Sequence, residues 1–357
     1  MSGGVDSSLA AAMMLERGFD VVGVTIKTHN YEDVGGNDNR DSSCCSLDGI
    51  NMARIVSRKL DIPHYVFDFS DRFRSEVIDG FVSEYLAGRT PNPCVVCNQK
   101  IKWEYLLEKA DALDADFICT GHYARLRFDA SSGRYILSRG TDTSKDQSYA
   151  LYGLSQSSLA RTVFPLSAMT KPQVRDAAAK LGLASASKPE SYEICFVADN
   201  NYARFLRDYV PGIDSTLGGG EVRYKGETIG KHNGYPFYTI GQRKGLGVSN
   251  EMPLYVRSIN PGTNVLEVDV ERSLYASRFT IERLNFVKYP VLECGSVYTT
   301  KIRYKDSGAE CVVRSFGDST MELEFTSPRR AITPGQSAVL YEGDDIVGGG
   351  IISRVIG

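Results

Sequence analysis

The first two hundred residues alternate short apolar runs with amphipathic stretches. Runs rich in β-branched and aromatic residues predict buried strands, and apolar residues at helical spacing predict helices between them. The expected strands are 21–26, 65–68 and 117–120, the expected helices are 52–60, 102–113 and one that ends at 81–86, and Thr170 is expected to cap a further helix that ends at Gly182. This alternation predicts an α/β domain with a parallel sheet covered on both faces and ligands at the carboxyl ends of its strands.

The pattern changes along the second half of the chain. A β-hairpin is expected between Arg125 and Arg139, and a short helix opens at residues 145–149. After about Tyr209 the helical spacing gives way to glycine-rich, alternating stretches, and from Ser277 short strands recur at intervals that suit a small barrel. We therefore expect three domains: an α/β domain over 1–208, a small, mainly β domain over 209–276 and a C-terminal β-barrel over 277–357.

Composition narrows the class of protein. The chain has 357 residues, of which 42% are hydrophobic and 24% charged, as in ordinary globular proteins with two or three cores. No apolar run reaches the length of about 20 residues that a membrane helix needs, and no basic and apolar leader opens the sequence. The net charge of −3 argues against binding nucleic acid by bulk electrostatics but allows local basic patches. We expect a cytoplasmic protein without a membrane partner, and a monomer.

A glycine and serine loop opens the chain. Gly3 and Gly4 allow close approach of a phosphate to the main chain, and Ser7 and Ser8 are expected at the N-cap of the apolar helix that follows. The positive end of a helix dipole suits a pyrophosphate or triphosphate, so the loop predicts an ATP site. Considered alone, Gly-Gly before serines could be only a turn. The Walker pattern fits poorly, because the stretch 226–231 has one spacer too few.

The eight cysteines are too few for a secreted disulfide scaffold of this length. Cys94 and Cys97 are three residues apart in a proline-stiffened loop, and Cys97 is expected at the N-terminus of a helix carrying lysines, where a thiol pKa falls. The pair could be a metal half-site, a redox pair or two buried thiols. Cys195 follows a helix-breaking proline, and Cys44 and Cys45, adjacent in a polar loop, are possible accessory thiols.

Six ordered strings carry a resemblance to a known family. They are SGGVDSS at 2–8, TPNPCVVCN at 90–98, TGHYA at 120–124, KDQSY at 145–149, EICF at 193–196 and YTIGQRKGLG at 238–247. The first resembles the signature of the PP-loop ATP pyrophosphatases, and together they resemble the tRNA-specific 2-thiouridylases. That resemblance extends through Arg303-Tyr304 to the TPGQS string at 333–337. It implies a PP-loop domain, a small central domain and a C-terminal β-barrel. PP-loop enzymes usually carry an apolar strand just before the signature, and we expect that adding such a strand would stabilise this chain.

The resemblance also implies an activity. The family makes 2-thiouridine at the wobble position of tRNAs for Lys, Glu and Gln, by adenylating the uracil C2 oxygen and replacing it with sulfur. It implies ATP with Mg²⁺ as the activating reagent, and a cysteine desulfurase or sulfur-relay protein as the sulfur source. Cys195 would carry a persulfide, and Cys97 would be the nucleophile that takes Cys195 into a disulfide or releases its sulfur. The wobble base would have to be flipped from its stack.

The remaining residue roles follow position by position from the same resemblance. ATP would be bound by Ser2, Gly3, Gly4, Val5, Asp6, Ser7, Ser8, Ile26 and Gly121. The target base would contact Asn92, Pro93 and Cys94, and tRNA would contact His122, Lys145, Asp146, Gln147, Arg303, Tyr304 and Gln336. From the sequence alone, His122 is more readily interpreted as a strand-end histidine bonded to a neighbour than as a tRNA contact.

Three alternatives remain open at this point. Many family members have Asp where this chain has Cys94, so Cys94, Cys97 and Cys195 could hold three corners of an iron-sulfur cluster. A PP-loop enzyme with another acceptor, such as argininosuccinate synthetase or a glutamine-dependent amidating enzyme, would not need the Cys97 and Cys195 pair. A non-enzymatic tRNA-binding or iron-sulfur scaffold protein would release no AMP.

Overall fold

The structure of the chain is a computed structural model that describes residues 1–29, 47–189, 194–197 and 199–356. Cys44, Cys45 and Glu193, which the sequence singles out, lie outside these ranges. The chain forms two compact units that do not follow the order of the sequence. Unit 1 comprises Met1–Ile78, Cys94–Asn201 and Asp344–Ile346, and unit 2 comprises Asp79–Pro93, Tyr202–Gly343 and Val347–Gly357.

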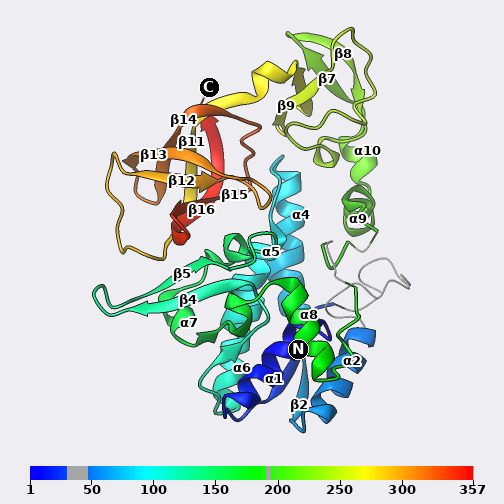
Figure 1. The fold of residues 1–357 in the computed structure, drawn as a ribbon. Coiled ribbons are helices and arrows are strands. Elements are labelled where there is room, and N and C mark those ends of the chain that lie inside the picture. Colours follow the sequence, from blue (N-terminus) through cyan, green and yellow to red (C-terminus); the bar gives the residue numbers. More distant parts are fainter. Residues whose placement is uncertain (30–46, 190–193, 198, 357) are drawn as a thin grey trace. The chain divides into compact units, whose positions relative to one another are not determined.

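Unit 1 has α/β architecture, as the alternating pattern predicts (Figure 1). Its strands are β1 (Gly23–Lys27), β2 (His64–Asp68), β3 (Ile118–Cys119), β4 (Ala124–Asp129), β5 (Arg134–Arg139) and β6 (Thr162–Val163). Its helical elements are α1 (Val5–Glu16), α2 (Leu47–Lys59), α3 (Ser70–Phe73), η2 (Arg74–Ile78), α5 (Pro93–Val96), η3 (Cys97–Tyr105), α6 (Leu106–Ala112), η4 (Ser148–Leu151), α7 (Gln156–Ala160), η5 (Pro165–Ala168) and α8 (Lys171–Lys180).

The parallel strands of unit 1 lie in two short sheets. Strand β1 pairs in parallel with β2, and β3 pairs in parallel with β6. The N-terminal segment runs beside β1, because the Met1 amino group donates to the Val24 carbonyl oxygen and the Thr25 hydroxyl donates to the Met1 carbonyl oxygen at 2.6 Å. The expected parallel pairing is therefore present, but within the described residues it is divided between two pairs of strands.

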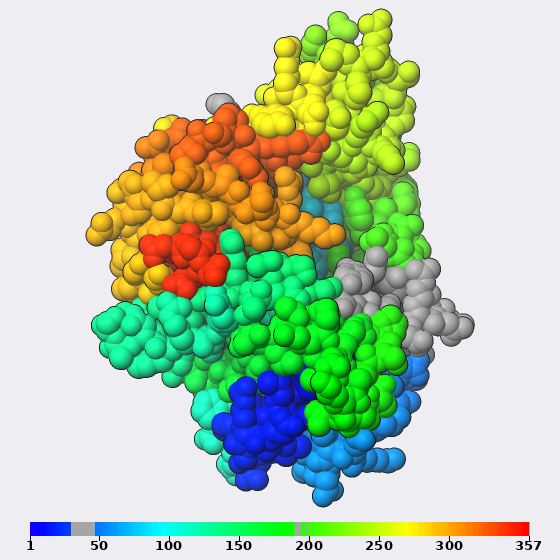
Figure 2. Space-filling view, in the orientation of Figure 1, coloured from blue at the N-terminus to red at the C-terminus, as the bar shows by residue number. Residues whose placement is uncertain are grey.

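Helix α1 is buried on most of its surface because its sequence is almost entirely small and apolar. Leu9 is 1% exposed, and it belongs to a core cluster with Val56 of α2 and Val174 of α8. Helix α8 is fixed at its start by a capping box between Thr170 and Gln173. Figure 2 shows the blue N-terminal residues next to the green segment that contains α8, in agreement with the contacts between α1 and α8.

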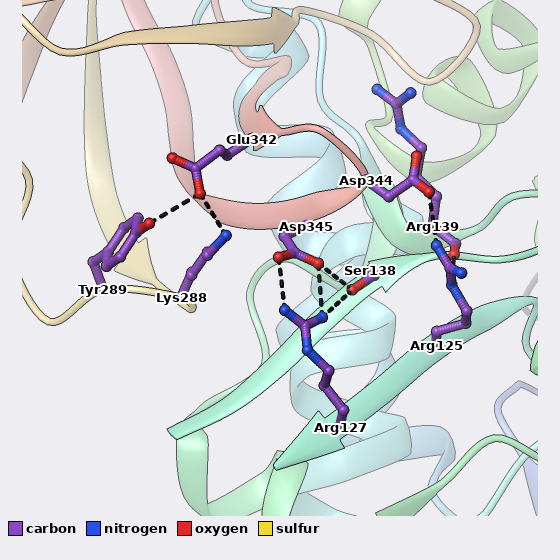
Figure 3. A network of polar contacts seen from close by, with 9 residues as sticks. All are labelled: Arg125, Arg127, Ser138, Arg139, Lys288, Tyr289, Glu342, Asp344 and Asp345. Atoms are coloured by element: carbon purple, nitrogen blue, oxygen red, sulfur yellow. Dashed lines mark hydrogen bonds and ion pairs between the residues drawn. The ribbon is translucent and has the colours of Figure 1, made fainter. Parts of the chain in front are cut away.

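The hairpin β4–β5 matches the expectation from the sequence and is fixed at one edge by two carboxylates of the same unit (Figure 3). Arg127 makes a bidentate ion pair with Asp345 at 2.8 Å, and the Ser138 hydroxyl donates to the same carboxylate at 2.6 Å. Arg125 donates to Asp344 at 2.7 Å. These side-chain contacts support the antiparallel pairing of β16 with β5, in which Asp345 lies opposite Ser138.

Among its described residues, unit 2 contains α4 (Asp79–Leu86), two further α-helices, two short 3₁₀ helices and two groups of strands. The helical elements are α9 (Tyr202–Tyr209), α10 (Ile213–Leu217), η6 (Tyr235–Phe237) and η7 (Glu271–Leu274). The strands are β7 (Gly220–Tyr224), β8 (Glu227–His232), β9 (Tyr255–Asn260), β10 (Val265–Asp269), β11 (Tyr275–Phe286), β12 (Val297–Lys301), β13 (Ala309–Phe316), β14 (Thr320–Arg330), β15 (Ser337–Glu342) and β16 (Asp345–Ile356), whose first two residues belong to unit 1.

The last six strands close into a barrel. Their order is β11-β14-β13-β12-β15-β16, and β16 pairs back to β11, so the sheet has no free edge at this join. Stretches of β12, β13 and β14 alternate between buried and more exposed residues, whereas β15 and β16 each have five consecutive buried residues. The interior is filled by apolar side chains such as Phe279, Leu323 and Val313, each 0% exposed. The Lys288 ammonium and the Tyr289 hydroxyl both donate to Glu342 on the outside (Figure 3).

The other four strands form a separate sheet in the order β8-β7-β10-β9. This confirms a small, mainly β region between the α/β segment and the barrel. The sequence pattern missed α10, which follows Gly212 at a φ of 78°, and it missed β7, β8 and the long β11. Within the described residues, no helix combines the length and the apolar character that crossing a membrane requires.

Candidate active site

The loop Ser2–Gly4 and the first turn of α1 form a tight structure. Gly3 has a φ of +70°, and a Cβ atom on it would lie 2.2 Å from the Gly49 carbonyl oxygen, so only glycine fits there. Gly4 is the N-cap, in an extended conformation, and the helix begins at Val5. The first N–H groups of a helix have no acceptor within the helix, so this turn can bind an anion.

The expectation that Ser7 and Ser8 are N-cap residues is wrong. Both lie inside the first turn, and their hydroxyls donate back to the Gly4 carbonyl oxygen at 3.1 and 2.9 Å. The Ser7 hydroxyl also accepts from the Ser2 N–H at 3.2 Å. The serines therefore hold the loop in its closed shape, a role that a glycine N-cap without a side chain cannot supply.

The end of β3 packs directly on this loop. A Cβ atom at Gly121 would lie 2.7 Å from the Asp6 carbonyl carbon and 2.8 Å from the Ser7 nitrogen. The close approach requires glycine at this position and brings the residues after β3 to the N-terminus of α1. Two sequence-predicted ATP-site segments, far apart in the chain, thus meet.

The Asp6 carboxylate has two partners that the sequence analysis missed. The Lys171 ammonium lies 2.7 Å and 2.8 Å from its two oxygens, and the Tyr123 hydroxyl donates to it at 2.7 Å. The Lys171 side chain is 9% exposed and comes from the first residue of α8. A buried lysine must be paired, and this one places a cation beside the phosphate loop. The only signal in the sequence was its position after the Thr170 cap.

Ile26 lies near the carboxyl end of β1, opposite Phe67 of β2, and is half-buried. Val5 is 3% exposed and belongs to the core beneath the loop. The contact with adenosine that the resemblance implies for Ile26 stays a prediction.

His122 is a buried histidine. Its Nδ1 atom is 2.9 Å from the Thr120 hydroxyl, and its ring lies against Trp103 and Phe164, with ring centres 5.6 and 6.2 Å away. Burial, assisted by the positive charge of Lys102, lowers the pKa of His122 well below its usual value of 6.5. The structure therefore contains the strand-end hydrogen bond that one interpretation of the sequence predicted, and the suggested tRNA contact stays a prediction.

The expected position of Cys97 at a helix N-terminus is wrong. The helical segment begins at Pro93, as α5, so Cys94 lies in the first turn and Cys97 begins the π-helix η3 that continues it. Proline fits the first turn because it needs no hydrogen-bond acceptor for its nitrogen. Cys97 is a half-buried thiol and Cys94 an exposed one.

Cys195 lies next to a buried aromatic anchor in the same unit as Cys97. Phe196 is 1% exposed and packs edge-on against Phe73 of α3, with ring centres 5.7 Å apart. Phe73 also packs against His29, which follows β1. Helix α3 in turn contacts η3, the helix that starts with Cys97. The segments that carry the two half-buried thiols thus pack on one short helix.

The residues for an iron-sulfur cluster do not fit together. Cys94, Cys97 and Cys195 are all within the described ranges, yet no group of three or more His, Cys, Asp or Glu residues there could hold a metal ion. The cluster that the sequence left open is therefore not supported, and no step is assigned to it.

The stretch Lys145–Gln147 makes mainly local contacts. Asp146 accepts hydrogen bonds from the Gly140 and Ser148 N–H groups at 3.3 and 3.1 Å. Gln147 exchanges two hydrogen bonds of 3.0 Å with the Tyr123 main chain. Gln147 therefore orients the residue whose hydroxyl binds Asp6, and Lys145 is half-buried next to it.

In unit 2, the TPNP string is held by the C-terminal TPGQ string. The Gln336 side-chain amide donates to the carbonyl oxygens of Thr90 and Pro91 at 2.9 and 3.2 Å. Gly335, at a φ of +91°, approaches Thr90 so closely that a Cβ atom would lie 2.8 Å from its carbonyl oxygen. Asn92 and Pro93 follow directly, so Gln336 fixes the main chain that leads to the expected base contacts.

Arg303 and Tyr304 lie in the same unit. The Arg303 guanidinium contacts the Arg330 carbonyl oxygen at 3.5 Å, and Tyr304 is 42% exposed. An exposed aromatic ring is suited to stacking on a base, and an arginine beside it is suited to binding phosphate. The tRNA contact of these two residues stays a prediction.

Comparison with known proteins matches the chain along almost its whole length. Residues 1–199 match the tRNA methyl transferase HUP domain, residues 204–269 the tRNA methyl transferase PRC-barrel domain, and residues 276–352 the aminomethyltransferase beta-barrel domain. The chain is 50% identical to the tRNA-specific 2-thiouridylase MnmA of Salinibacter ruber, covering 100% of this chain and 94% of that protein. The proteins of the same name from Amoebophilus asiaticus and Cytophaga hutchinsonii are 48% and 47% identical, covering 99% of this chain and 93% and 95% of theirs.

Proposed function

The chain belongs to the tRNA-specific 2-thiouridylase family, and we propose that it uses ATP to replace the C2 oxygen of the wobble uridine of tRNA with sulfur. The observation that carries the proposal is the meeting of the Ser2–Gly4 loop, the α1 N-terminus and Gly121 at one place. That geometry suits a polyphosphate. The relatives that match along the whole chain are named tRNA-specific 2-thiouridylases, which agrees with the proposed activity.

In the first step the uracil C2 oxygen attacks the α-phosphorus of ATP and pyrophosphate leaves. Ser2, Gly3, Gly4, Val5, Asp6, Ser7 and Ser8 form the part of the site that would hold the phosphates, with Ile26 and Gly121 beside the adenosine. Main-chain N–H groups at the start of α1 would stabilise negative charge there. The C2 oxygen then leaves as part of AMP, which is a far better leaving group.

The residues at this loop are compatible with Mg²⁺. Such an ion is usually held by one or two carboxylates together with substrate phosphate oxygens. Asp6 is the carboxylate in place, and its ion pair with Lys171 orients it at the start of α1. Bound Mg²⁺ would neutralise charge on the triphosphate.

In the second step sulfur comes from a persulfide on Cys195, which an external cysteine desulfurase or relay protein loads. Its terminal sulfur attacks C2 as AMP leaves, and the Cys97 thiolate then attacks the Cys195 sulfur, so 2-thiouridine is released and a Cys97–Cys195 disulfide forms. Alternatively Cys97 attacks first and frees hydrosulfide, which attacks C2. Both routes end in the same disulfide, and an external dithiol reduces it. The packing of both cysteine segments on α3 supports this pairing.

The tRNA must present a flipped base, because the C2 oxygen is inaccessible in a stacked anticodon. We propose Asn92, Pro93 and Cys94 as base contacts, and His122, Lys145, Asp146, Gln147, Arg303, Tyr304 and Gln336 as a surface and its supports for tRNA. The proposed substrates are the tRNAs for Lys, Glu and Gln. We propose that a cytoplasmic monomer acts on them, with domains at 1–208, 209–276 and 277–357.

A nucleoside assay tests the proposal. Unmodified tRNA is incubated with the protein, ATP and a persulfide donor, and digested nucleosides are analysed by mass spectrometry for 2-thiouridine, with AMP measured in parallel. Wild type should form 2-thiouridine and AMP, whereas Cys195→Ser and Cys97→Ser should bind ATP but form no 2-thiouridine. Cys294→Ser, at an exposed thiol of unit 2, serves as the matched control and should be fully active. Absence of 2-thiouridine with wild type would refute the proposal.

A further inference from the structure

The GQRKGLG string of the central β region has no role in the chemistry described so far. It forms the loop Gly241–Gly247, which precedes β9 in unit 2. Arg243 and Lys244 at its tip are both exposed. Leu246 next to them is 5% exposed and anchors the loop in the core.

The backbone of this loop is held rigidly. The Gly241 N–H donates to the Val256 carbonyl oxygen at 2.8 Å, and the Val256 N–H donates to the Gln242 carbonyl oxygen at 2.9 Å. The Gln242 side chain accepts from the Thr239 N–H at 3.1 Å and donates to the Lys244 carbonyl oxygen at 2.9 Å. One glutamine therefore closes the loop around the two cations.

Glycines make the shape possible. Gly241, Gly245 and Gly247 have φ values of +85°, +77° and +68°, a region that other residues adopt only with strain. Three glycines in this conformation and the Gln242 hydrogen bonds thus shape the loop that carries Arg243 and Lys244. Neither Arg243 nor Lys244 has an ion-pair partner in the part of the chain that the structure describes.

The loop is continuous with the segment that leads to the proposed base contacts. The Thr239 hydroxyl, at its start, accepts a hydrogen bond from the Thr90 hydroxyl at 3.3 Å, and Asn92 lies two residues beyond Thr90. On the other side of the loop, a Cβ atom at Gly241 would lie 3.5 Å from the Arg330 guanidinium. The main-chain oxygen of Arg330 accepts a hydrogen bond from the Arg303 guanidinium. Arg330 therefore lies between Arg303 and the loop, and its own charge is paired with Glu271 at 2.9 Å.

We propose that Arg243 and Lys244 bind the phosphate backbone of tRNA beside the flipped nucleotide, and so fix the position of the anticodon strand. The inference rests on the proposed function. Exposed cations on a hydrogen-bonded loop, with no acidic partner among the described residues, are suited to phosphate, which carries no sequence information but positions the substrate. A local patch of this kind is consistent with the net charge of −3, which argues against binding of nucleic acid by bulk electrostatics.

The test compares tRNA binding by two double variants. Arg243→Ala with Lys244→Ala removes the two loop charges, and Lys225→Ala with Lys231→Ala removes two exposed charges from the β7–β8 hairpin of the same unit. The loop variant should weaken tRNA binding at least tenfold near physiological salt. Its plot of log affinity against log salt should flatten by roughly 1 to 2, since each lost phosphate contact contributes about 0.7 to 0.9. The hairpin variant should match wild type.

Further readouts separate this inference from the proposed function. In the loop variant KM for tRNA should rise with kcat changed less than about twofold, ATP binding should be unaltered, and Arg243→Lys with Lys244→Arg should restore the salt dependence. A loop variant with the affinity and salt slope of wild type would overturn the inference while wild type still forms 2-thiouridine. If wild type forms no 2-thiouridine but the loop variant still binds tRNA at least tenfold more weakly than wild type, the proposed function is overturned and the loop assignment stands.

Discussion

At the scale of single residues, the charge at the nucleotide loop is set by contacts between distant parts of the chain. Asp6 is bound by Tyr123 and Lys171, which are 117 and 165 positions away. No local pattern predicts such a pair, because the spacing that brings them together is produced by the packing of α1 on α8. The close packing of Gly3 and Gly121 involves glycines that stand out in the sequence strings, and their role in binding ATP stays a prediction.

The Lys171 ion pair leads to a first prediction. Lys171→Gln should lower ATP affinity at least fivefold and destabilise unit 1 by about 1–3 kcal/mol, because the partly buried Asp6 carboxylate loses its cation. ATP affinity is measured by calorimetry and stability by thermal unfolding. Lys180→Gln is the matched control at the other end of α8, where the lysine side chain is 75% exposed and pairs with Asp176 on the surface. Equal effects of the two changes would contradict the assignment.

The buried His122 leads to a second prediction, concerning pH. Its pKa is lowered in the folded protein by burial, so below about pH 6.5 the unfolded chain binds a proton that the folded chain does not. Stability of unit 1 should therefore fall on acidification below that pH, by up to about 1.4 kcal/mol per pH unit from this residue. His122→Asn should show a shallower loss, with the remainder partly due to His64, whose pKa is also lowered by burial.

Trp103 makes this measurable. It is the only tryptophan of the chain, it is fully buried in unit 1, and its ring centre is 5.6 Å from that of His122. Denaturant unfolding followed by its fluorescence at pH 5 and pH 7 gives the difference in free energy of unfolding. His232→Asn, in unit 2, should leave this difference as in wild type. An unchanged pH dependence in His122→Asn would show that the histidine is protonated in the folded state.

At the scale of elements, the periodicity of the sequence predicted helices and strands that are defined by residues close together in the chain. The hairpin β4–β5, helix α2 and the cap of α8 were expected close to where they occur. The start of the cysteine-bearing helix was not, because a proline at a first-turn position was interpreted as part of a loop, and so the helix was placed after Cys97. This four-residue difference moves the helix N-terminus from Cys97 to the neighbourhood of Cys94.

The segment before that helix leads to a third prediction. Gln336→Ala removes both side-chain hydrogen bonds to Thr90 and Pro91. The rate of 2-thiouridine formation should fall about tenfold or more, because a loosened main chain positions the target base poorly, while ATP affinity stays unchanged. A steady-state thiolation assay with ATP-binding calorimetry measures both.

Gln156→Ala is the matched control for this change. Gln156 also exchanges two hydrogen bonds with a main chain, accepting from Tyr135 N–H at 2.8 Å and donating to its carbonyl oxygen at 3.0 Å, but it does so beside β5 in unit 1. The Gln156→Ala protein should be less stable than wild type but should keep the wild-type thiolation rate at saturating ATP and tRNA. A similar loss of rate in both variants would mean that Gln336 acts only through general stability.

At the scale of the whole molecule, the α/β start, the small central β region and the closing barrel were all foreseeable from changes in pattern. The pattern could not predict how the barrel closes, because pairing of β11 with β16 joins residues about seventy positions apart. It also missed β11 itself. The division into units was equally hidden, since α4 belongs with residues more than a hundred positions later.

The barrel core leads to the last prediction. Phe279 is fully buried and stacks on Phe325 with ring centres 5.3 Å apart, so Phe279→Ala should destabilise the barrel by about 3–5 kcal/mol through lost apolar contact and a remaining cavity. Phe316→Ala is the matched control, because this ring is 39% exposed at the end of β13, and it should change stability by less than about 0.5 kcal/mol.

Because a chain with two compact units need not unfold in one step, calorimetry is combined with Trp103 fluorescence, which reports unit 1 alone. We expect Phe279→Ala to lower the calorimetric transition of unit 2 by more than it lowers the Trp103 transition. An equal shift of both transitions would show that the two units unfold as one cooperative body, and thermal stability measured by either signal would then describe the whole chain.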